Sequence, residues 1–579
     1  MMNLSLKVLC LAAVAVMVEP LPALAAAERE GQPQVWVLSG LERALRHTLP
    51  GPNAKAVVRA ARNEWESFQI VLRSSTPVRI LDVVPGTLRG PAGAALPSDS
   101  MRLYREHQLN ITRPSGANKD FEPGWYPDAL IPFRHPMTSE RLKGGRFQAV
   151  PFELPANETH AFWADVHIPS NAAAGRYAGE IAVQIEGSAP LTVPVEVEIW
   201  EFTLPERPAM YTEFGSPAER MPRYYGSLMK KGVLDKMPDL AAIYEQCSRL
   251  TAEHRLNSPP PPDLLAYDMR EDGSFELSAQ QIADLKRWAD RFHLNALPVP
   301  APRRRFRDPD ADRDRIHRWL RSWDRAFDAA GLGDLLVYTY LYDEPNSRTA
   351  YQIVRRWGRC VRESGSRVKA LVVEQTKTQD EAWGDLYGAV DIWVPLFPLF
   401  DADTARARQE RGEQIWTYTA LTQRKPTPWW QTELPLCHYR VPAWIGWRYE
   451  MKGLLYWGSL SHWSHVEDTW TDPATYQPGN RSRPISKRTT YNGEGLLVYP
   501  ARDVGFDGVV PSMRLKALRD GLEDFDYLAL LESRGLRGKA LEIVMPIGPS
   551  WFEWARDPQA YLKAREQLAA VILQGKRQK

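Results

Sequence analysis

Two adjacent carboxylates directly follow an apolar segment in the middle of the chain. Residues 335–340 are Leu, Val, Thr and Tyr, and the chain continues through Leu341 and Tyr342 to Asp343, Glu344 and Pro345. Proline cannot donate a ladder hydrogen bond, so the strand should end there. Acids at such a place can also simply stabilise the start of the next helix. At the carboxyl end of a strand in a β/α barrel we instead interpret Asp343 and Glu344 as catalytic.

Glycoside hydrolysis is the chemistry that a pair of carboxylates most often performs. It usually needs one acid and one nucleophile or base. In many retaining barrels the second carboxylate follows strand seven, but here that region, 415–419, contains no acid. Two alternatives remain open. Either Glu374, after the fifth predicted strand, is the partner, or Asp343 and Glu344 act together.

Adjacent carboxylates are too close together to flank a glycosidic bond as a standard pair. They suit substrate-assisted hydrolysis, in which the oxygen of the sugar's own 2-acetamido group attacks the anomeric carbon. Glu344 would then protonate the leaving oxygen, and Asp343 would hold the acetamido N–H. Strict strand alternation places neighbouring side chains on opposite faces. This mechanism therefore requires the strand to end, or to bulge, at Asp343.

Six further residues are candidates for substrate binding. Each also has a structural interpretation, as a core residue or a solvated acid. Glu213, at the end of the first predicted strand, can bond a sugar hydroxyl, and Tyr418 can bond the acetamido carbonyl. The others are Glu374 and three tryptophans whose faces can stack on sugar rings, Trp393, Trp457 and Trp463.

A barrel is the architecture that would position these residues. From residue 208 onward, predicted strands alternate with predicted helices. This pattern predicts a TIM-like (β/α)8 barrel over 208–535. The helix with Ile316, Trp319, Leu320, Trp323 and Phe327 on one face is typical of such a unit. Eight strands are predicted, at 210–214, near Asn257, and at 296–299, 335–340, 368–373, 392–395, 414–418 and 453–457. A doubly wound sheet is the alternative.

An all-β domain should precede the barrel, at 28–207. Residues 191–199 alternate strictly between apolar and other side chains, and turn residues separate several such runs, which is typical of a β-sandwich. Residues 1–27 have a basic start, an apolar run and an A-x-A site, as a signal peptide does. Residues 536–579 form a predicted helical tail. We therefore expect an exported protein, periplasmic or extracellular, without a membrane span in its mature chain.

Composition excludes several other classes of function. The 579-residue chain has a net charge of +2, which argues against nucleic acid as the main partner. It contains 21 Trp, which suits carbohydrate. No phosphate-binding loop or zinc ligand set is present. The aspartates at 308–314 lack the glycine and glutamate of a calcium loop, so we expect neither a metal nor a cofactor.

The motifs together resemble glycoside hydrolase family 123. The Asp-Glu-Pro at 343–345 looks like its catalytic pair, and the segments 453–457 and 512–527 are similar to the signature of domain of unknown function 4091, which closes the same type of barrel. Members of family 123 are retaining β-N-acetylgalactosaminidases that use substrate assistance. The resemblance implies that Asp343 orients the acetamido group, that Glu344 is the acid/base, and that the partner is a glycan with a terminal 2-acetamido sugar.

Two rival hypotheses remain. The first is a glycosidase of other specificity that uses Glu344 with a distant carboxylate such as Glu374. The second is a non-catalytic carbohydrate-binding surface protein that kept the fold. In the segment 512–527, the charges of Arg514, Arg519, Glu523 and Asp524 are expected to form ion pairs that hold the closing helix rather than to contact a ligand.

Overall fold

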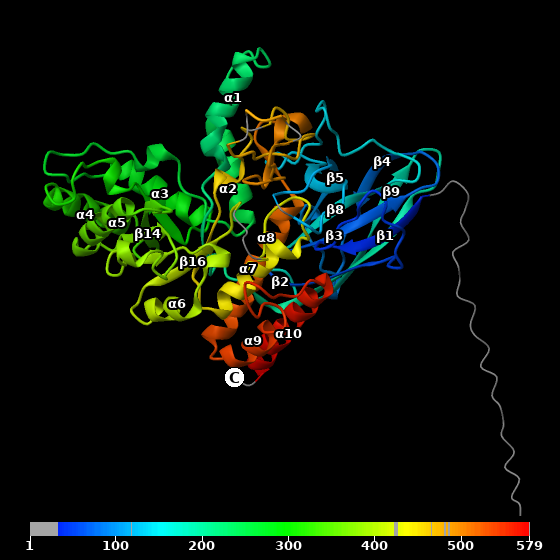
Figure 1. The fold of residues 1–579 in the computed structure, drawn as a ribbon. Coiled ribbons are helices and arrows are strands. Elements are labelled where there is room, and N and C mark those ends of the chain that lie inside the picture. The colour runs from blue at the N-terminus through cyan, green and yellow to red at the C-terminus, as the bar shows by residue number, and fades with distance from the viewer. Residues whose placement is uncertain are drawn as a thin grey trace, which may run out of the picture.

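The computed structural model describes residues 33–116, 118–421, 426–464, 466–479, 482–484 and 487–577. The predicted signal peptide, 1–27, lies outside these residues. Two β-rich bodies dominate the rest, and helix α8 (Met513–Ser533) lies between them (Figure 1).

The N-terminal body is a sandwich of two five-stranded sheets. Along β10 the side chains of Val193, Val195, Val197 and Ile199 are buried, as the predicted period of two requires. One sheet has the order β1 (Gln34–Ser39), β3 (Glu64–Arg73), β8 (Thr159–Ile168), β5 (Met101–Ile111), β6 (Gly124–Pro132). The other has the order β2 (Ala56–Arg62), β10 (Leu191–Thr203), β9 (Gly175–Ile185), β4 (Val78–Pro85), β7 (Phe152–Leu154).

The second body contains a parallel, nearly closed barrel of seven strands. In spatial order they are β11 (Tyr211–Glu213), β17 (Gly453–Leu455), β16 (Gln414–Tyr418), β15 (Ile392–Trp393), β14 (Lys369–Val373), β13 (Leu336–Asp343) and β12 (Ala296–Val299). Seven of the eight predicted strands are present, so the prediction of eight was wrong in one place.

The missing strand is the one predicted near Asn257. The backbone N–H of Asn257 donates to Thr212 Oγ1 of β11 at 2.7 Å, and its Nδ2 donates to the Ala296 carbonyl of β12 at 3.0 Å. An irregular segment thus bridges the gap between the two edge strands. Four consecutive prolines, 259–262, follow Asn257. Because proline has no N–H to donate, this segment cannot form a regular ladder.

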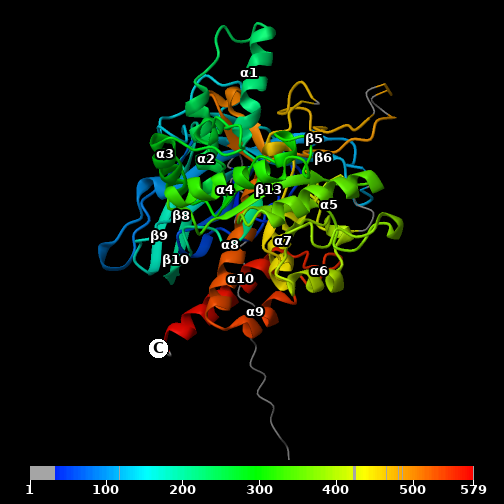
Figure 2. The same cartoon turned by 90° about the vertical axis from the view of Figure 1, so that its left-hand side faces the viewer.

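Helices surround the barrel as the amphipathic patterns predict. They are α2 (Leu240–Glu253), α3 (Ala279–Arg291), α4 (Arg313–Ala329), α5 (Arg348–Glu363), α6 (Ala402–Gln409) and α7 (Cys437–Arg448). The apolar face predicted for α4, from Ile316 to Phe327, is buried. Helix α1 (Met221–Lys230) instead projects away from the barrel (Figures 1 and 2).

Helix α8 joins the barrel to the sandwich through buried ion pairs. Arg514 donates to Asp128 of β6 at 2.8 Å, and Lys516 donates to Asp165 of β8 at 2.7 Å. On the opposite side, Asp524 accepts from Arg440 of α7 at 2.6 Å. The predicted structural role of these charges is therefore confirmed. Helices α9 (Arg537–Val544) and α10 (Pro558–Arg577) pack against α8, so the predicted tail is part of the same body.

Candidate active site

A β-bulge in β13 decides where Asp343 points. Tyr340 pairs with Leu371 of β14, but the next pairs are Tyr342 with Val372 and Asp343 with Val373, so one extra residue lies between Tyr340 and Tyr342. Leu371 and Val373 belong to the apolar cluster inside the barrel, whereas Val372 belongs to the main core outside it. The extra residue therefore moves Asp343 to the inner face, the same face as Tyr340. The bulge that the paired mechanism requires is present.

Glu344 follows in a conformation that few residues adopt. Its φ is 44°, in the left-handed region, and its N–H donates to the Val373 carbonyl at 3.2 Å. Such a conformation typically costs about 1–3 kcal/mol and is concentrated at functional sites. It allows the side chain of Glu344 to reach β16, where the Tyr418 hydroxyl donates to Glu344 Oε1 at 2.6 Å. Two successive carboxylates thus leave the strand toward the same interior.

Each of the two carboxylates accepts a hydrogen bond from a different tyrosine. The Tyr340 hydroxyl donates to Asp343 Oδ1 at 3.0 Å, and Tyr418 donates to Glu344. Burial, and secondly the charge of the neighbouring carboxylates, raises the pKa of both tyrosines above the usual value, so both remain donors. Asp343 and Glu344 are exposed, and within the described residues Oδ2 and Oε2 have no partner. These two oxygens are available to a substrate.

Glu213 lies at the end of β11 and faces the same barrel interior. Its carboxylate accepts a hydrogen bond from the hydroxyl of Tyr338, which precedes Tyr340 by two residues on β13. Burial raises the pKa of Glu213 to about 7, against the hydrogen bond from Tyr338, which lowers it. This contact connects β11 to β13 across the barrel interior and places a titratable acid beside the strand that carries Asp343.

Glu374 is close to the pair but enclosed. Its side chain is 5% exposed, and Gln379 Nε2 donates to its Oε2 at 3.0 Å. The same Gln379 donates to Asn346 Oδ1 at 2.9 Å, just beyond Glu344. Burial, with a smaller contribution from the charge of Glu344, raises the pKa of Glu374 to about 7. A carboxylate held in this way is suited to supporting the loop more than to approaching a sugar ring.

The three tryptophans have different environments. Trp457, after β17, is half-buried, and its Nε1 donates to Glu494 Oε1 at 2.5 Å. Trp463 lies in the wall of a separate cavity. Trp393 is 1% exposed, packs in the core outside the barrel, and donates to Glu413 Oε2 at 2.7 Å. Trp393 has no free face, so its predicted role in stacking on a sugar is not supported.

Sequence reasoning missed several residues that hold the site together. Tyr338 and Tyr340 bind Glu213 and Asp343, and their spacing of two residues on the strand was a usable signal. Gln379 and Glu494 lie in irregular segments, 33 residues from Asn346 and 37 residues from Trp457, to which they are bonded. No local pattern identifies such residues, because only the fold brings them to the site.

The described residues contain neither a metal-binding cluster nor a membrane-spanning helix. Within them, no group of three or more His, Cys, Asp or Glu side chains is placed to hold a metal ion. Two of the aspartates considered for calcium, Asp308 and Asp310, pair with Arg356 just before α4. Across the same part of the chain, no helix is both long and apolar enough to cross a bilayer.

Comparison with known proteins gives two family matches. Residues 313–531 match the model of the glycoside hydrolase 123 catalytic domain, and residues 46–185 match that of the glycoside hydrolase 123 N-terminal domain. The two models together match more than half of the chain and include β13, Asp343, Glu344 and α8. No curated protein matches the chain.

A solved structure of a family 123 enzyme has a similar overall fold. A family 123 glycoside hydrolase from Clostridium perfringens, described in connection with glycolipid glycan hydrolysis, superimposes with a TM-score of 0.63 at 15% identity, covering 94% of this chain and 98% of that one. A family 39 glycoside hydrolase from Bacteroides cellulosilyticus has a TM-score of 0.30 at 10% identity, with 83% of each chain covered.

Proposed function

The chain belongs to glycoside hydrolase family 123 and is a glycoside hydrolase, and from this premise we propose that it is an exported, retaining, exo-acting β-N-acetylhexosaminidase that uses substrate assistance. The proposed substrate is a glycan with a terminal 2-acetamido sugar, and N-acetylgalactosamine is the sugar that the family resemblance favours. Glycolipid glycans are candidates, since they are named for the clostridial relative.

The proposed reaction has two steps. The acetamido carbonyl oxygen attacks the anomeric carbon while the bond to the leaving oxygen breaks, and Glu344 gives that oxygen its proton. Asp343 accepts the acetamido N–H and balances the positive charge of the oxazolinium-like intermediate. Water then attacks the anomeric carbon from the other face as the bond between that carbon and the acetamido oxygen breaks, and Glu344 takes the proton of the water. The acetamido group and the enzyme are regenerated, and the configuration is retained.

The observation that carries this proposal is the pair of adjacent carboxylates on one face. The bulge turns Asp343 inward, and the positive φ of Glu344 keeps its carboxylate within reach of Tyr418. Each carboxylate then has one oxygen fixed by a tyrosine hydroxyl and one oxygen available. A standard pair needs a gap of about 5 Å or more for the sugar, whereas neighbouring residues support an acetamido group from one side.

The alternative pairs Glu344 with Glu374. The raised pKa of Glu374 is an observation in its favour, because catalytic acids often have raised pKa values. Its enclosure by Gln379 is an observation against it. The two mechanisms make opposite demands on the substrate, since only substrate assistance needs the 2-acetamido group.

A panel of nitrophenyl glycosides tests the proposal. We expect the β-linked 2-acetamido sugars to be cleaved, the galacto compound faster than the gluco compound, and plain glucosides and galactosides to be nearly inert. A thiazoline mimic of the intermediate should inhibit strongly, because it resembles the species that the site stabilises. Indifference to the thiazoline together with cleavage of plain glycosides would support the pair of Glu344 and Glu374. Fractionation of the producing cells, with N-terminal sequencing of the mature protein, tests the proposed export.

A further inference from the structure

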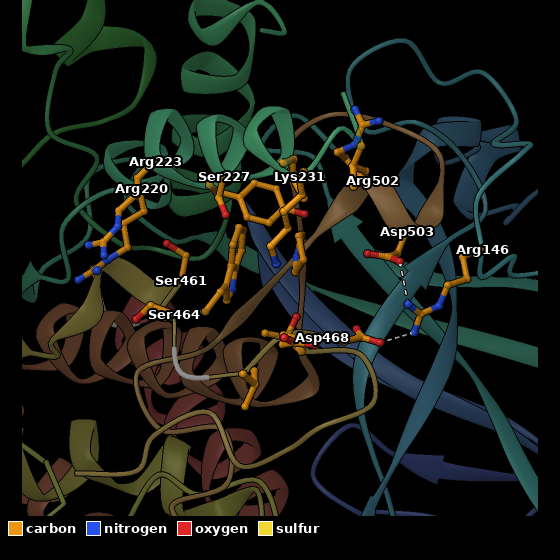
Figure 3. A pocket seen from close by; sticks show the side chains of 18 residues that line it. Arg146, Arg220, Arg223, Ser227, Lys231, Ser461, Ser464, Asp468, Arg502 and Asp503 are labelled. Atoms are coloured by element: carbon orange, nitrogen blue, oxygen red, sulfur yellow. Dashed lines mark hydrogen bonds and ion pairs between the residues drawn. The ribbon is translucent and has the colours of Figure 1, made fainter. Parts of the chain in front are cut away.

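A cavity opens beside the barrel, apart from Asp343 and Glu344. It has a volume of about 770 Å³ and is lined by 18 residues, among which neither Asp343 nor Glu344 occurs. Its walls come from helix α1 and the residues that flank it, from the segments 461–469 and 500–503 after β17, and from Arg146 of the sandwich (Figure 3). A volume of this size suits one or two sugar rings.

Part of the charge in this cavity is already neutralised by ion pairs. Arg146 pairs with Asp468 at 2.7 Å and with Asp503 at 3.4 Å, and these contacts are drawn in Figure 3. Arg502 pairs with Asp507 at 2.7 Å. These residues therefore form part of the framework of the cavity and leave little charge for a ligand.

Three cations in the same wall have no partner among the residues that the structure describes. Within the described residues, the side chains of Arg220, Arg223 and Lys231 make no hydrogen bond or ion pair, and Arg220 Nε is buried without an acceptor. One acid of the lining, Glu467, is likewise unpaired and exposed. The cavity thus has an excess of positive charge, and a buried guanidinium N–H without an acceptor is costly unless a ligand supplies one.

An aromatic corner lies next to these cations. The rings of Tyr224 and Trp463 meet edge to face, 4.9 Å apart, and both line the cavity. Trp463 Nε1 donates to the Val498 carbonyl at 3.0 Å, which fixes the orientation of its ring. Fixed aromatic rings beside cations are suited to a ligand that has both an apolar ring face and negative charge.

The cavity opens at the same edge of the barrel as the catalytic residues. Arg220 follows Glu213 by seven residues, and Trp463 follows Trp457 by six, so both walls leave directly from carboxyl ends of strands. The Ser459 hydroxyl donates to Glu219 Oε2 at 3.3 Å and joins the two walls. A glycan bound at the catalytic edge can therefore extend into this cavity.

We propose that this cavity binds an acidic sugar of the glycan, a uronate or an O-sulfated residue, through Arg220, Arg223 and Lys231, with Trp463 and Tyr224 against the ring. Guanidinium groups match the planar carboxylate and the sulfate oxygens with paired hydrogen bonds. The proposal rests on the proposed function for the presence of a glycan. Its test measures binding apart from turnover.

The experiment uses the full chain with Glu344→Gln, which stops turnover, and calorimetric titration with three trisaccharides. All three end in N-acetylgalactosamine, and they differ in the middle sugar, which is glucuronate, glucose or 6-O-sulfated glucose. We expect either acidic compound to bind at least about tenfold more tightly than the neutral one, as one charge-assisted hydrogen bond allows. Added salt should reduce this advantage. The two acidic compounds distinguish a carboxylate site from a sulfate site.

Charge-neutralising variants show which residues cause the tighter binding of the acidic trisaccharides. The double variant Arg220→Gln/Arg223→Gln should abolish the preference for acidic compounds, and Lys231→Gln should reduce it. Lys230→Gln is the matched control, because Lys230 is exposed, adjacent in sequence and absent from the lining, and it should keep the preference. In the background with Glu344 intact, hydrolysis of a nitrophenyl 2-acetamido glycoside should be unchanged in every variant, which also shows that each is folded.

Equal binding of the acidic and neutral trisaccharides would overturn the proposal, as would a preference that survives both Arg220→Gln/Arg223→Gln and Lys231→Gln. Tighter binding of single-stranded DNA or anionic lipid vesicles than of the acidic trisaccharides would also overturn it. A wild-type protein that binds acidic trisaccharides but cleaves no 2-acetamido glycoside would instead refute the proposed function and leave the acidic site in place.

Discussion

The Tyr340 hydroxyl donates a hydrogen bond to Asp343 Oδ1 across 3.0 Å, from a position three residues earlier on the same strand. In a regular strand, residues three apart face opposite sides. The contact is possible because the bulge between Tyr340 and Tyr342 brings both side chains to the barrel interior. Backbone geometry, rather than the identity of the residues alone, thus brings Tyr340 and Asp343 together.

Glu344→Gln should remove the proton donor. A missing general acid typically costs about 10²–10⁴ in rate. We expect the loss in kcat to be smallest for aryl glycosides, whose leaving groups need little protonation, and largest for natural glycans. Steady-state kinetics on both substrate types measures the difference. Glu542→Gln, at an exposed position on α9, is the matched control and should behave as the wild type. An equal loss on both substrate types would contradict the acid role.

Asp343→Asn should slow hydrolysis of every leaving group, because the charge that supports the intermediate is lost while the shape is kept. Tyr340→Phe should have a smaller effect, about tenfold on kcat, since it removes one hydrogen bond to the carboxylate. Tyr340 acts through Asp343, so its loss should also shift the pH profile of kcat, which a purely structural role would not do. An unchanged pH profile in Tyr340→Phe would exclude this positioning role.

Glu374→Gln separates the two mechanisms. Our account places Glu374 in a supporting loop, so the amide should preserve the hydrogen-bonded geometry and most of the activity. The alternative, in which Glu374 is the second carboxylate, requires activity to collapse. The comparison is made on the nitrophenyl 2-acetamido glycoside that the wild type cleaves best.

The same variant should change stability in a pH-dependent way. The pKa of Glu374 is raised to about 7 in the folded protein from about 4.5 in an unfolded chain, so the folded state retains its proton longer. The contribution of Glu374 to the free energy of unfolding is therefore most favourable below pH 4.5. It falls by up to about 3 kcal/mol as the pH rises through 7. The Tm of Glu374→Gln should therefore increase relative to the Tm of the wild type as the pH rises from 5 to 8. A constant difference in Tm across that range would contradict the raised pKa.

Asp165→Asn should destabilise the joint between the sandwich and α8. Asp165 is buried and accepts hydrogen bonds from Lys516 and Arg519, whose charges hold the pKa of its carboxyl well below the usual range. Removing one partner from a buried ion pair typically costs about 3–5 kcal/mol. Denaturant unfolding measures the loss, with the exposed Asp235→Asn as control. A loss below 1 kcal/mol would show that α8 does not depend on this pair.

The sequence was informative where a pattern is local. The period of two in β10, the apolar face of α4 and the acids before Pro345 all depend on neighbours in the chain, and the structure has these elements in place. Asn257 shows the opposite case, because its role as a bridge between β11 and β12 exists only once both strands have paired around the barrel. The contact of Trp393 with Glu413, twenty residues later, likewise exists only in the folded chain.

The most direct test of substrate assistance changes the nucleophile on the substrate. A series of nitrophenyl sugars with acetamido, fluoroacetamido, difluoroacetamido and trifluoroacetamido groups at C2 makes the carbonyl oxygen progressively less nucleophilic. Our account predicts that kcat/KM falls at each step, and that the matching 2-hydroxy sugar is nearly inert. Rates independent of fluorination, with turnover of the 2-hydroxy sugar equal to or above that of the acetamido sugar, would contradict it and place the second carboxylate at Glu374.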